Sequence, residues 1–139
     1  MIQRIQSIYL LLSSAFTSLL FMFPIASAEK TADGAFQDGV LNLDDSGILL
    51  GLAIAVSALA FLAIFLFKNR ILQMNLGKLN MLLAVGLLVF AIYLLMSAGV
   101  SWGLGIGLFV PLVSLILIVM ANRAIGQDEA LVKSADRIR

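Results

Sequence analysis

The chain has 139 residues, of which 62% are hydrophobic and only 12% are charged, and its formal net charge is +1. A soluble domain is about 45–50% apolar and about a quarter charged, so this composition indicates a chain that lies in lipid. The absence of Cys and His excludes disulfides and thiolate metal sites, and it removes the commonest general base and metal ligand. The small net charge gives no reason to expect a nucleic-acid partner.

Four apolar runs without Asp, Glu, Lys or Arg predict four membrane-spanning helices, over residues 5–26, 48–67, 79–98 and 104–121. At a rise of about 1.5 Å per residue, each run is about 27–33 Å long, which suits a hydrocarbon core of about 30 Å. Backbone groups in lipid must be satisfied internally, and the runs lack the alternating pattern of membrane strands. The predicted fold is therefore an all-α integral membrane four-helix bundle, a single domain over residues 1–139.

The connections between these runs define the expected topology. The short connection over 99–103 predicts a tight turn and an antiparallel hairpin of the third and fourth helices. Residues 27–47 form a longer polar loop, and residues 68–78 form a short basic loop. In the polar tail over 122–139, helical spacing of apolar residues predicts a short amphipathic helix after Gly126.

Lys and Arg residues fall almost entirely on one side of the predicted spans. Eight of them flank that side: Arg4, Lys68, Arg70, Lys78, Arg123, Lys133, Arg137 and Arg139. The other side carries only Lys30, together with acidic residues such as Glu29 and Asp33, and with Trp102, whose ring suits the membrane interface. Since basic loops stay in the cytoplasm, we expect both termini to be cytoplasmic.

Residues 1–28 also resemble a secretory signal peptide. Arg4 precedes an apolar stretch, and Ala26-Ser27-Ala28 after Pro24 fits a cleavage site. The apolar stretch exceeds the length of about 7–15 residues that is typical of signal peptides, which favours a retained helix. Cleavage would leave three spans and an external N-terminus.

Small residues at helical spacing predict where the helices pack. Gly47 and Gly51 are one turn apart near the second run, and Gly103 and Gly107 repeat this spacing near the fourth. Small faces let backbones approach closely, so we expect them to point into the bundle; a contact between two chains is the alternative. Pro111 lies inside the fourth run and predicts a kink, either static or a hinge. On the third run, one face carries Asn80, Ala84, Ala91 and Ala98.

The predicted spans contain little reactive chemistry. Their only ionisable side chains are tyrosines, such as Tyr93, which makes an ion-coupled transporter a poor interpretation. The hydroxyls can each bond to their own helix and lack an activating base: Ser13, Ser14, Thr17, Ser57, Ser97 and Ser114. The acidic loop does not have the spacing of an EF-hand. We therefore expect no catalytic residue, metal or cofactor.

The candidate site is the charged cytoplasmic face, which could bind anionic lipid or a protein partner. Asn80 and Asn122 stand at the predicted cytoplasmic ends of helices, where an Asn can cap a helix or bridge to a neighbour. The candidate residues are Arg4, Lys68, Arg70, Lys78, Asn80, Asn122, Arg123, Asp128 and Glu129.

Three stretches resemble a known family. They are M-I-Q-R-I-Q-S-I-Y-L-L-L (1–12), F-K-N-R-I-L-Q-M-N-L-G-K-L-N (67–80) and A-N-R-A-I-G-Q-D-E-A-L-V-K-S-A-D-R-I-R (121–139). In these stretches the chain is similar to a family of small four-helix inner-membrane proteins from Bacteroidota, in the domain-of-unknown-function series. The resemblance implies four retained helices in a bacterial inner membrane, and it carries no activity, substrate or ligand.

These observations favour a non-enzymatic accessory or assembly subunit that presents its charged face to a membrane or cytoplasmic protein partner. The alternative is a small-solute or lipid-handling channel or transporter, as an oligomer, whose path is lined by Gly103, Gly105, Gly107 and the kink at Pro111. A membrane-interface enzyme would need a convergent polar cluster. The candidates for that cluster are Arg4, Asn80, Asn122 and Asp128, which helix capping and salt bridging explain as well.

Overall fold

The computed structural model describes residues 3–28, 38–99 and 101–136. These residues form four α-helices: α1 (Gln3–Ser18), α2 (Gly47–Phe65), α3 (Arg70–Ser97) and α4 (Phe109–Asp136). They also form two 3₁₀ turns, η1 (Leu19–Phe21) and η2 (Ile106–Leu108), and three short strands, β1 (Ala26–Ala28), β2 (Val40–Leu41) and β3 (Trp102–Leu104). The predicted four-helix, mostly helical fold is confirmed, and a small sheet is added to it. Five charged residues that the topology prediction used lie outside the described residues: Glu29, Lys30, Asp33, Arg137 and Arg139.

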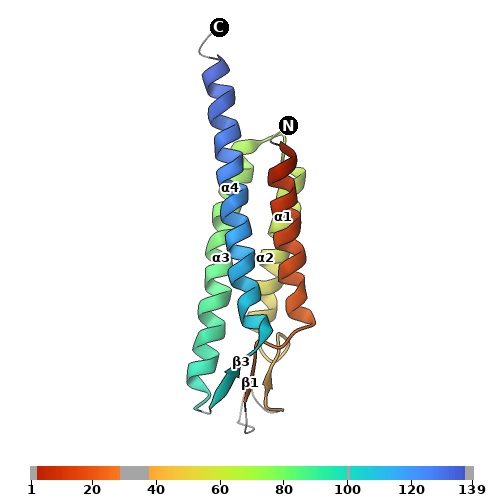
Figure 1. Cartoon of the computed structure of the whole chain (residues 1–139), viewed down its shortest axis with the longest axis vertical. Coiled ribbons are helices and arrows are strands. Elements are labelled where there is room, and N and C mark those ends of the chain that lie inside the picture. Colours follow the sequence, from red (N-terminus) through yellow and green to blue (C-terminus); the bar gives the residue numbers. More distant parts are fainter. Residues whose placement is uncertain (1–2, 29–37, 100, 137–139) are drawn as a thin grey trace.

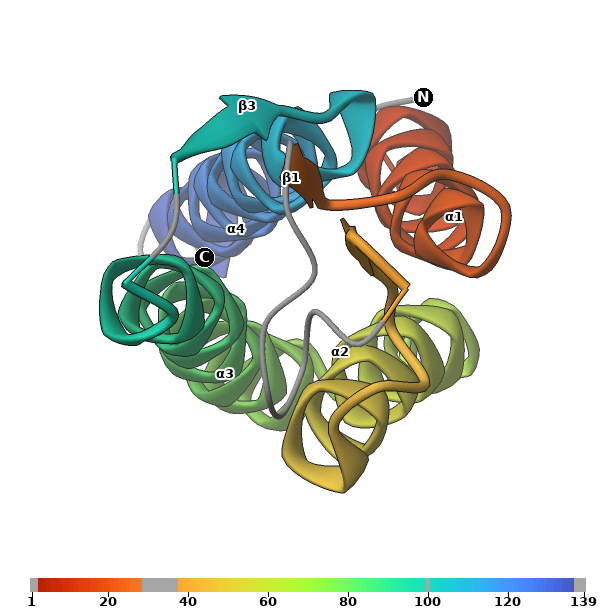
Figure 2. The ribbon, with the colours of Figure 1, turned by 90° about the horizontal axis from the view of Figure 1, so that it is seen from below.

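The four helices form a closed bundle with alternating directions. In Figure 1, α1 and α3 run downwards, and α2 and α4 run upwards. Each helix packs against its neighbours in the sequence, and α1 closes the ring by packing against α4 (Figure 2). The start of α1, the α2–α3 connection and the end of α4 therefore share one end of the bundle, as the predicted topology requires.

The first helix is shorter than predicted. The sequence predicted a helix over residues 5–26, but α1 ends at Ser18, η1 ends at Phe21 and Ala26 belongs to β1. Pro24 explains the difference, because it has no backbone N–H to donate and disfavours a helical conformation at Phe23. The apolar helix Ile5–Phe21 is therefore shorter than the three that are long and apolar enough to cross a membrane, which are Gly47–Phe65, Arg70–Ser97 and Ile106–Ala135.

The basic loop predicted over residues 68–78 is mostly helical. The helix α3 begins at Arg70, and the side chain of Asn69 caps it by accepting a hydrogen bond from the backbone N–H of Leu72 at 3.1 Å. Asn80 consequently lies well inside α3 and is only 2% exposed, so it does not cap the helix.

The helix α4 continues where a polar tail was predicted. It runs to Asp136, so Gly126 does not separate a short amphipathic helix from the fourth span. Figure 1 shows this end of α4 rising beyond the other helices. Pro111 is in the first turn of α4, where a missing N–H removes no helical hydrogen bond. The position of Pro111 therefore contradicts the predicted kink inside the fourth helix.

A small antiparallel sheet lies at the opposite end of the bundle, where the sequence predicted loops except at Ala26 and Leu104, which it wrongly assigned to helices. The strand β1 lies between β2 and β3, and Ala26 pairs with Leu41 on one side and Leu104 on the other. Next to the sheet, the backbone N–H of Gly107 donates to the carbonyl oxygen of Pro24 at 2.9 Å. Strands of two or three residues are too short to leave an alternating pattern in the sequence.

The glycine faces are only partly as predicted. Gly107 is buried against the backbone of Pro24. Gly47 and Gly51 are exposed, and a Cβ at either would meet no atom within 4 Å, so the prediction that they face the bundle is wrong. Gly103 is also exposed, in β3. The stripe that α2 buries instead consists of Leu49, Ala53, Val56, Ala60 and Ala63, which exclude more apolar area than glycine. The predicted face of α3 is buried at Asn80, Ala84 and Ala91.

Candidate functional site

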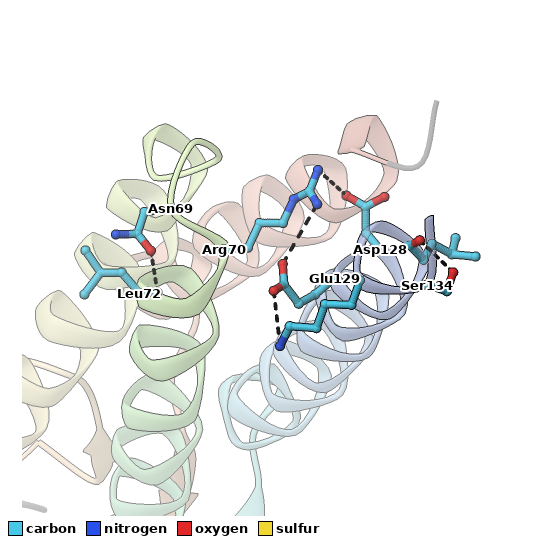
Figure 3. A network of polar contacts seen from close by, with 8 residues as sticks. Asn69, Arg70, Leu72, Asp128, Glu129 and Ser134 are labelled. Carbon is cyan, nitrogen blue, oxygen red and sulfur yellow. Dashed lines mark hydrogen bonds and ion pairs between the residues drawn. The ribbon is translucent and has the colours of Figure 1, made fainter. Parts of the chain in front are cut away.

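Charged residues from two helices meet at the end of the bundle where α1 begins and α4 ends. Arg70 of α3 forms ion pairs with Asp128 of α4, with Nη2 and Oδ2 3.2 Å apart, and with Glu129, with Nη1 and Oε2 3.9 Å apart. Lys133 lies one turn further along α4 and places its Nζ 3.4 Å from Oε1 of Glu129. We call Arg70, Asp128, Glu129 and Lys133 the charged cluster, and Figure 3 labels the first three of them.

The acidic side chains of the charged cluster lie near the N-terminus of α3, where negative charge is stabilising. The first turn of a helix has backbone N–H groups without helical acceptors, and it favours nearby negative charge. Asp128 and Glu129 supply that charge, and their side chains are only 15% and 18% exposed. Arg70 offsets the carboxylates in turn, and each partly exposed pair contributes at most about 1 kcal/mol. Charge therefore helps to hold the long end of α4 against α3.

A hollow of about 520 Å³ opens beside the charged cluster. It is lined by Phe67, Lys68, Asn69, Arg70, Ile71 and Glu129. Lys68 is exposed in the turn between α2 and α3. The hollow thus offers a cation, an amide and a carboxylate together, which is the mixed polar surface that another protein can bind with directional contacts.

Hydroxyl groups connect three helices inside the bundle. Ser114 Oγ of α4 lies 2.8 Å from Ser13 Oγ and 2.7 Å from Thr17 Oγ1 of α1, and all three residues are buried. Ser57 of α2 contacts Ser14 of α1, with their Oγ atoms 3.3 Å apart. We call these five residues the hydroxyl cluster. Thr17 also donates to the carbonyl of Ser13 in its own helix at 2.9 Å, as predicted, but the contacts between helices were not predicted.

Three amide side chains are also buried inside the bundle. Gln6 of α1 and Gln73 of α3 are 0% exposed, and Asn80 is 2% exposed. Gln73 Nε2 donates to the carbonyl of Ala63 at 2.9 Å. Within the described part of the chain, the other amide atoms of these three side chains have no hydrogen-bond partner. Sequence reasoning missed Gln6 and Gln73, although a seven-residue spacing places Gln6 with Ser13, and Gln73 with Asn80, on one helix face.

Asn80→Leu is expected to raise the free energy of unfolding by about 1 kcal/mol, because a buried amide without a partner costs about 1–3 kcal/mol. Asn122→Leu is the matched control on the neighbouring helix, since Asn122 Nδ2 donates to the carbonyl of Met74 at 3.4 Å and its side chain packs on Gly77. The free energy of unfolding of this control variant should fall by about 1–2 kcal/mol. Reversible unfolding in mild detergent, followed by circular dichroism, measures both variants. An equal fall in the free energy of unfolding of Asn80→Leu would contradict the conclusion that the Asn80 amide has no hydrogen-bond partner.

The structure brings together only part of the predicted site. Arg70, Asp128 and Glu129 meet in the charged cluster, and Lys68 lines the adjacent hollow. Arg4 belongs to the first turn of α1, and Lys78 and Arg123 are exposed on α3 and α4. In the described residues, no hydrogen bond or ion pair links the enzyme candidates Asn80, Asn122 and Asp128 to one another.

The acidic residues near the sheet serve local turns. Asp38 Oδ1 accepts a hydrogen bond from the N–H of Val40 at 3.2 Å, and Asp45 Oδ2 accepts one from the N–H of Asn42 at 2.6 Å. Among residues 3–28, 38–99 and 101–136, no group of three or more His, Cys, Asp or Glu side chains could hold a metal ion.

The fold and the site define a class of protein: a mostly helical four-helix chain with an apolar core that includes several buried hydroxyl and amide groups, exposed apolar helix faces and a charged cluster at one end. The family model described as "Domain of unknown function (DUF4293)" matches residues 2–138, so the chain belongs to that family. This match confirms the resemblance to a family in the domain-of-unknown-function series, and it extends over nearly the whole chain. No curated protein and no solved structure matches the chain.

Proposed function

We propose that the chain is a multi-pass protein of a bacterial inner membrane, with all four helices in the bilayer, as its resemblance to Bacteroidota inner-membrane proteins implies. Exposed apolar side chains on every helix support this placement, because such a belt invites association in water and is well solvated by lipid. Examples are Ile8 and Leu11 on α1, Ile54 and Phe65 on α2, Leu82 and Val89 on α3, and Ile116 and Met120 on α4.

The proposed orientation places the charged cluster in the cytoplasm, with both termini on the same side. The excess of Lys and Arg at this end supports the orientation. The contacts of α1 support its retention rather than its removal as a signal peptide. Leu10 is buried against Ala63 and Ala121, and the hydroxyl cluster joins α1 to α4. Loss of α1 would therefore expose the interior faces of two other helices.

The proposed role is that of a non-enzymatic accessory or assembly subunit. The observation that carries it is the charged cluster beside a polar hollow, at the end of a helix that extends beyond the bundle. In this role, α4 and the α2–α3 turn form the docking surface for a membrane or cytoplasmic protein.

The packing of the interior weighs against the channel or transporter alternative. Large buried side chains such as Leu41, Leu49, Leu87 and Leu95 fill the half of the bundle near the sheet. A continuous water path through one chain would have to displace this apolar cluster. The kink at Pro111, on which that alternative partly rested, is contradicted by the structure.

Site-specific photo-crosslinking in the native cell tests the proposed role. A photoreactive residue at position 133, on the exposed end of α4, is expected to give one discrete adduct with a different protein. The matched control is position 93 on α3, where Tyr93 is 62% exposed on the apolar face and lipid should be the main neighbour. Adducts only with copies of the chain, or protein adducts only from position 93, would contradict the accessory-subunit role.

A further inference from the structure

A groove of about 370 Å³ lies between α1 and α4, near the end of the bundle that carries the charged cluster. It is lined by Ile5, Tyr9, Met120, Arg123, Ala124 and Gln127, and we call it the α1–α4 groove. Its volume is within the usual range of about 300–1,000 Å³ for small-ligand sites. Ile5 and Met120 are 48% and 40% exposed, so the groove opens onto the apolar belt.

No carboxylate among the described side chains pairs with Arg123. The acidic residues Asp128 and Glu129 further along α4 pair with Arg70, and Glu129 also pairs with Lys133. At about 100° per residue, Asp128 and Glu129 are separated from Arg123 by about 140° and about 120° around the helix axis. Arg123 therefore lines the groove without a carboxylate partner among the described side chains, and Tyr9 and Gln127 line the same groove.

We infer that the α1–α4 groove binds an anionic phospholipid from the inner leaflet. The guanidinium group matches the geometry of a phosphate and can bond it through two parallel N–H groups. The Tyr9 hydroxyl and the Gln127 amide can donate hydrogen bonds to other headgroup oxygens. Ile5 and Met120 offer apolar walls where the acyl chains leave the headgroup. A neutral partner would leave Arg123 unpaired, and an acidic soluble protein would leave the apolar walls in water.

This inference rests on the proposed membrane placement. The test uses the full chain in nanodiscs of phosphatidylcholine with a minor share of phosphatidylglycerol, and native mass spectrometry counts the lipids that each released protein retains. Wild type should retain phosphatidylglycerol in preference to phosphatidylcholine. Arg123→Gln should reduce that preference about fivefold, the effect of losing one cation in direct contact with an anionic headgroup. Lys78→Gln removes a cation from the same end of the bundle but not from the groove, and it should leave the preference nearly unchanged.

Two results would overturn the site while leaving the membrane placement intact. One is equal retention of phosphatidylglycerol and phosphatidylcholine by wild type, and the other is an equal effect of Arg123→Gln and Lys78→Gln. Arg123→Lys separates the effect of charge from that of guanidinium geometry. It keeps the charge but loses the paired N–H groups, so it should show an intermediate preference for phosphatidylglycerol. A chain that does not enter the nanodiscs at all would overturn the proposed membrane placement itself.

Discussion

Gly107→Ala is expected to lower the free energy of unfolding by about 2–3 kcal/mol, the upper part of the usual range for overpacking. A Cβ at this position would lie 2.6 Å from the carbonyl oxygen of Pro24, 2.8 Å from its carbonyl carbon and 2.9 Å from the carbonyl oxygen of Phe23. These neighbours are backbone atoms, so no side-chain rotation can relieve the contact. Their displacement would also break the 2.9 Å hydrogen bond from Gly107 to Pro24.

Gly51→Ala is the matched control for this prediction. Gly51 is exposed in α2, and a Cβ there meets no atom within 4 Å. Because alanine favours helix over glycine by about 1 kcal/mol, this variant should be equally or more stable than wild type. Unfolding in mild detergent can be followed by the fluorescence of Trp102, the only tryptophan, which lies in β3 close to Gly107. Equal stability of both variants would contradict the close backbone contact at Gly107.

The contrast between these two glycines shows what small-residue spacing can and cannot predict. The same four-residue spacing marks Gly47 with Gly51 and Gly103 with Gly107. Only Gly107 is in tight contact, and its neighbour is the chain between η1 and β1 rather than a packed helix. Sequence spacing identifies residues that share a helix face, but it does not reveal which face another segment approaches.

Helix boundaries were predicted well where the apolar composition determines them and poorly where single residues do. The limits of α2 match the predicted span within two residues, because its apolar run begins and ends with the helix itself. Pro24 ends the first helix early, and Asn69 begins the third helix inside a stretch of polar residues. Charged residues are compatible with helix, so the polar sequence around Arg70 and Gly126 does not interrupt α3 or α4.

The charged part of the candidate site was predictable as a set of residues, but its pairing was not. The predicted topology places the basic residues and the acidic pair at positions 128 and 129 at the same end of the bundle. Which carboxylate meets Arg70 depends on α4 remaining helical beyond the bundle, so that Asp128 and Glu129 reach the start of α3. The hydroxyl cluster is unpredictable for a related reason: helical spacing relates each Ser and Thr to its own helix, whereas its contacts are completed by a neighbouring helix.

Ser114→Val is expected to lower the free energy of unfolding by about 2–3 kcal/mol, through two separate effects. The position is 0% exposed, so the added methyl groups overpack the space between α1 and α4. The substitution also removes the hydroxyl that lies within hydrogen-bonding distance of both Ser13 and Thr17. Ser114→Ala isolates the second effect, and it should lower the free energy of unfolding by about 1 kcal/mol, the usual net contribution of an intramolecular hydrogen bond.

Ser97→Ala and Ser97→Val provide the controls for the hydroxyl and for the added volume. Ser97 is exposed at the end of α3, and its hydroxyl donates only to the carbonyl of Leu94 in the same helix at 3.1 Å. Both variants should remain within about 0.5 kcal/mol of wild type. Unfolding titrations of all four variants in one detergent measure the difference. If Ser97→Ala lost as much stability as Ser114→Ala, the loss would not depend on contacts between helices, and the hydroxyl cluster would have no part in holding α1 against α4.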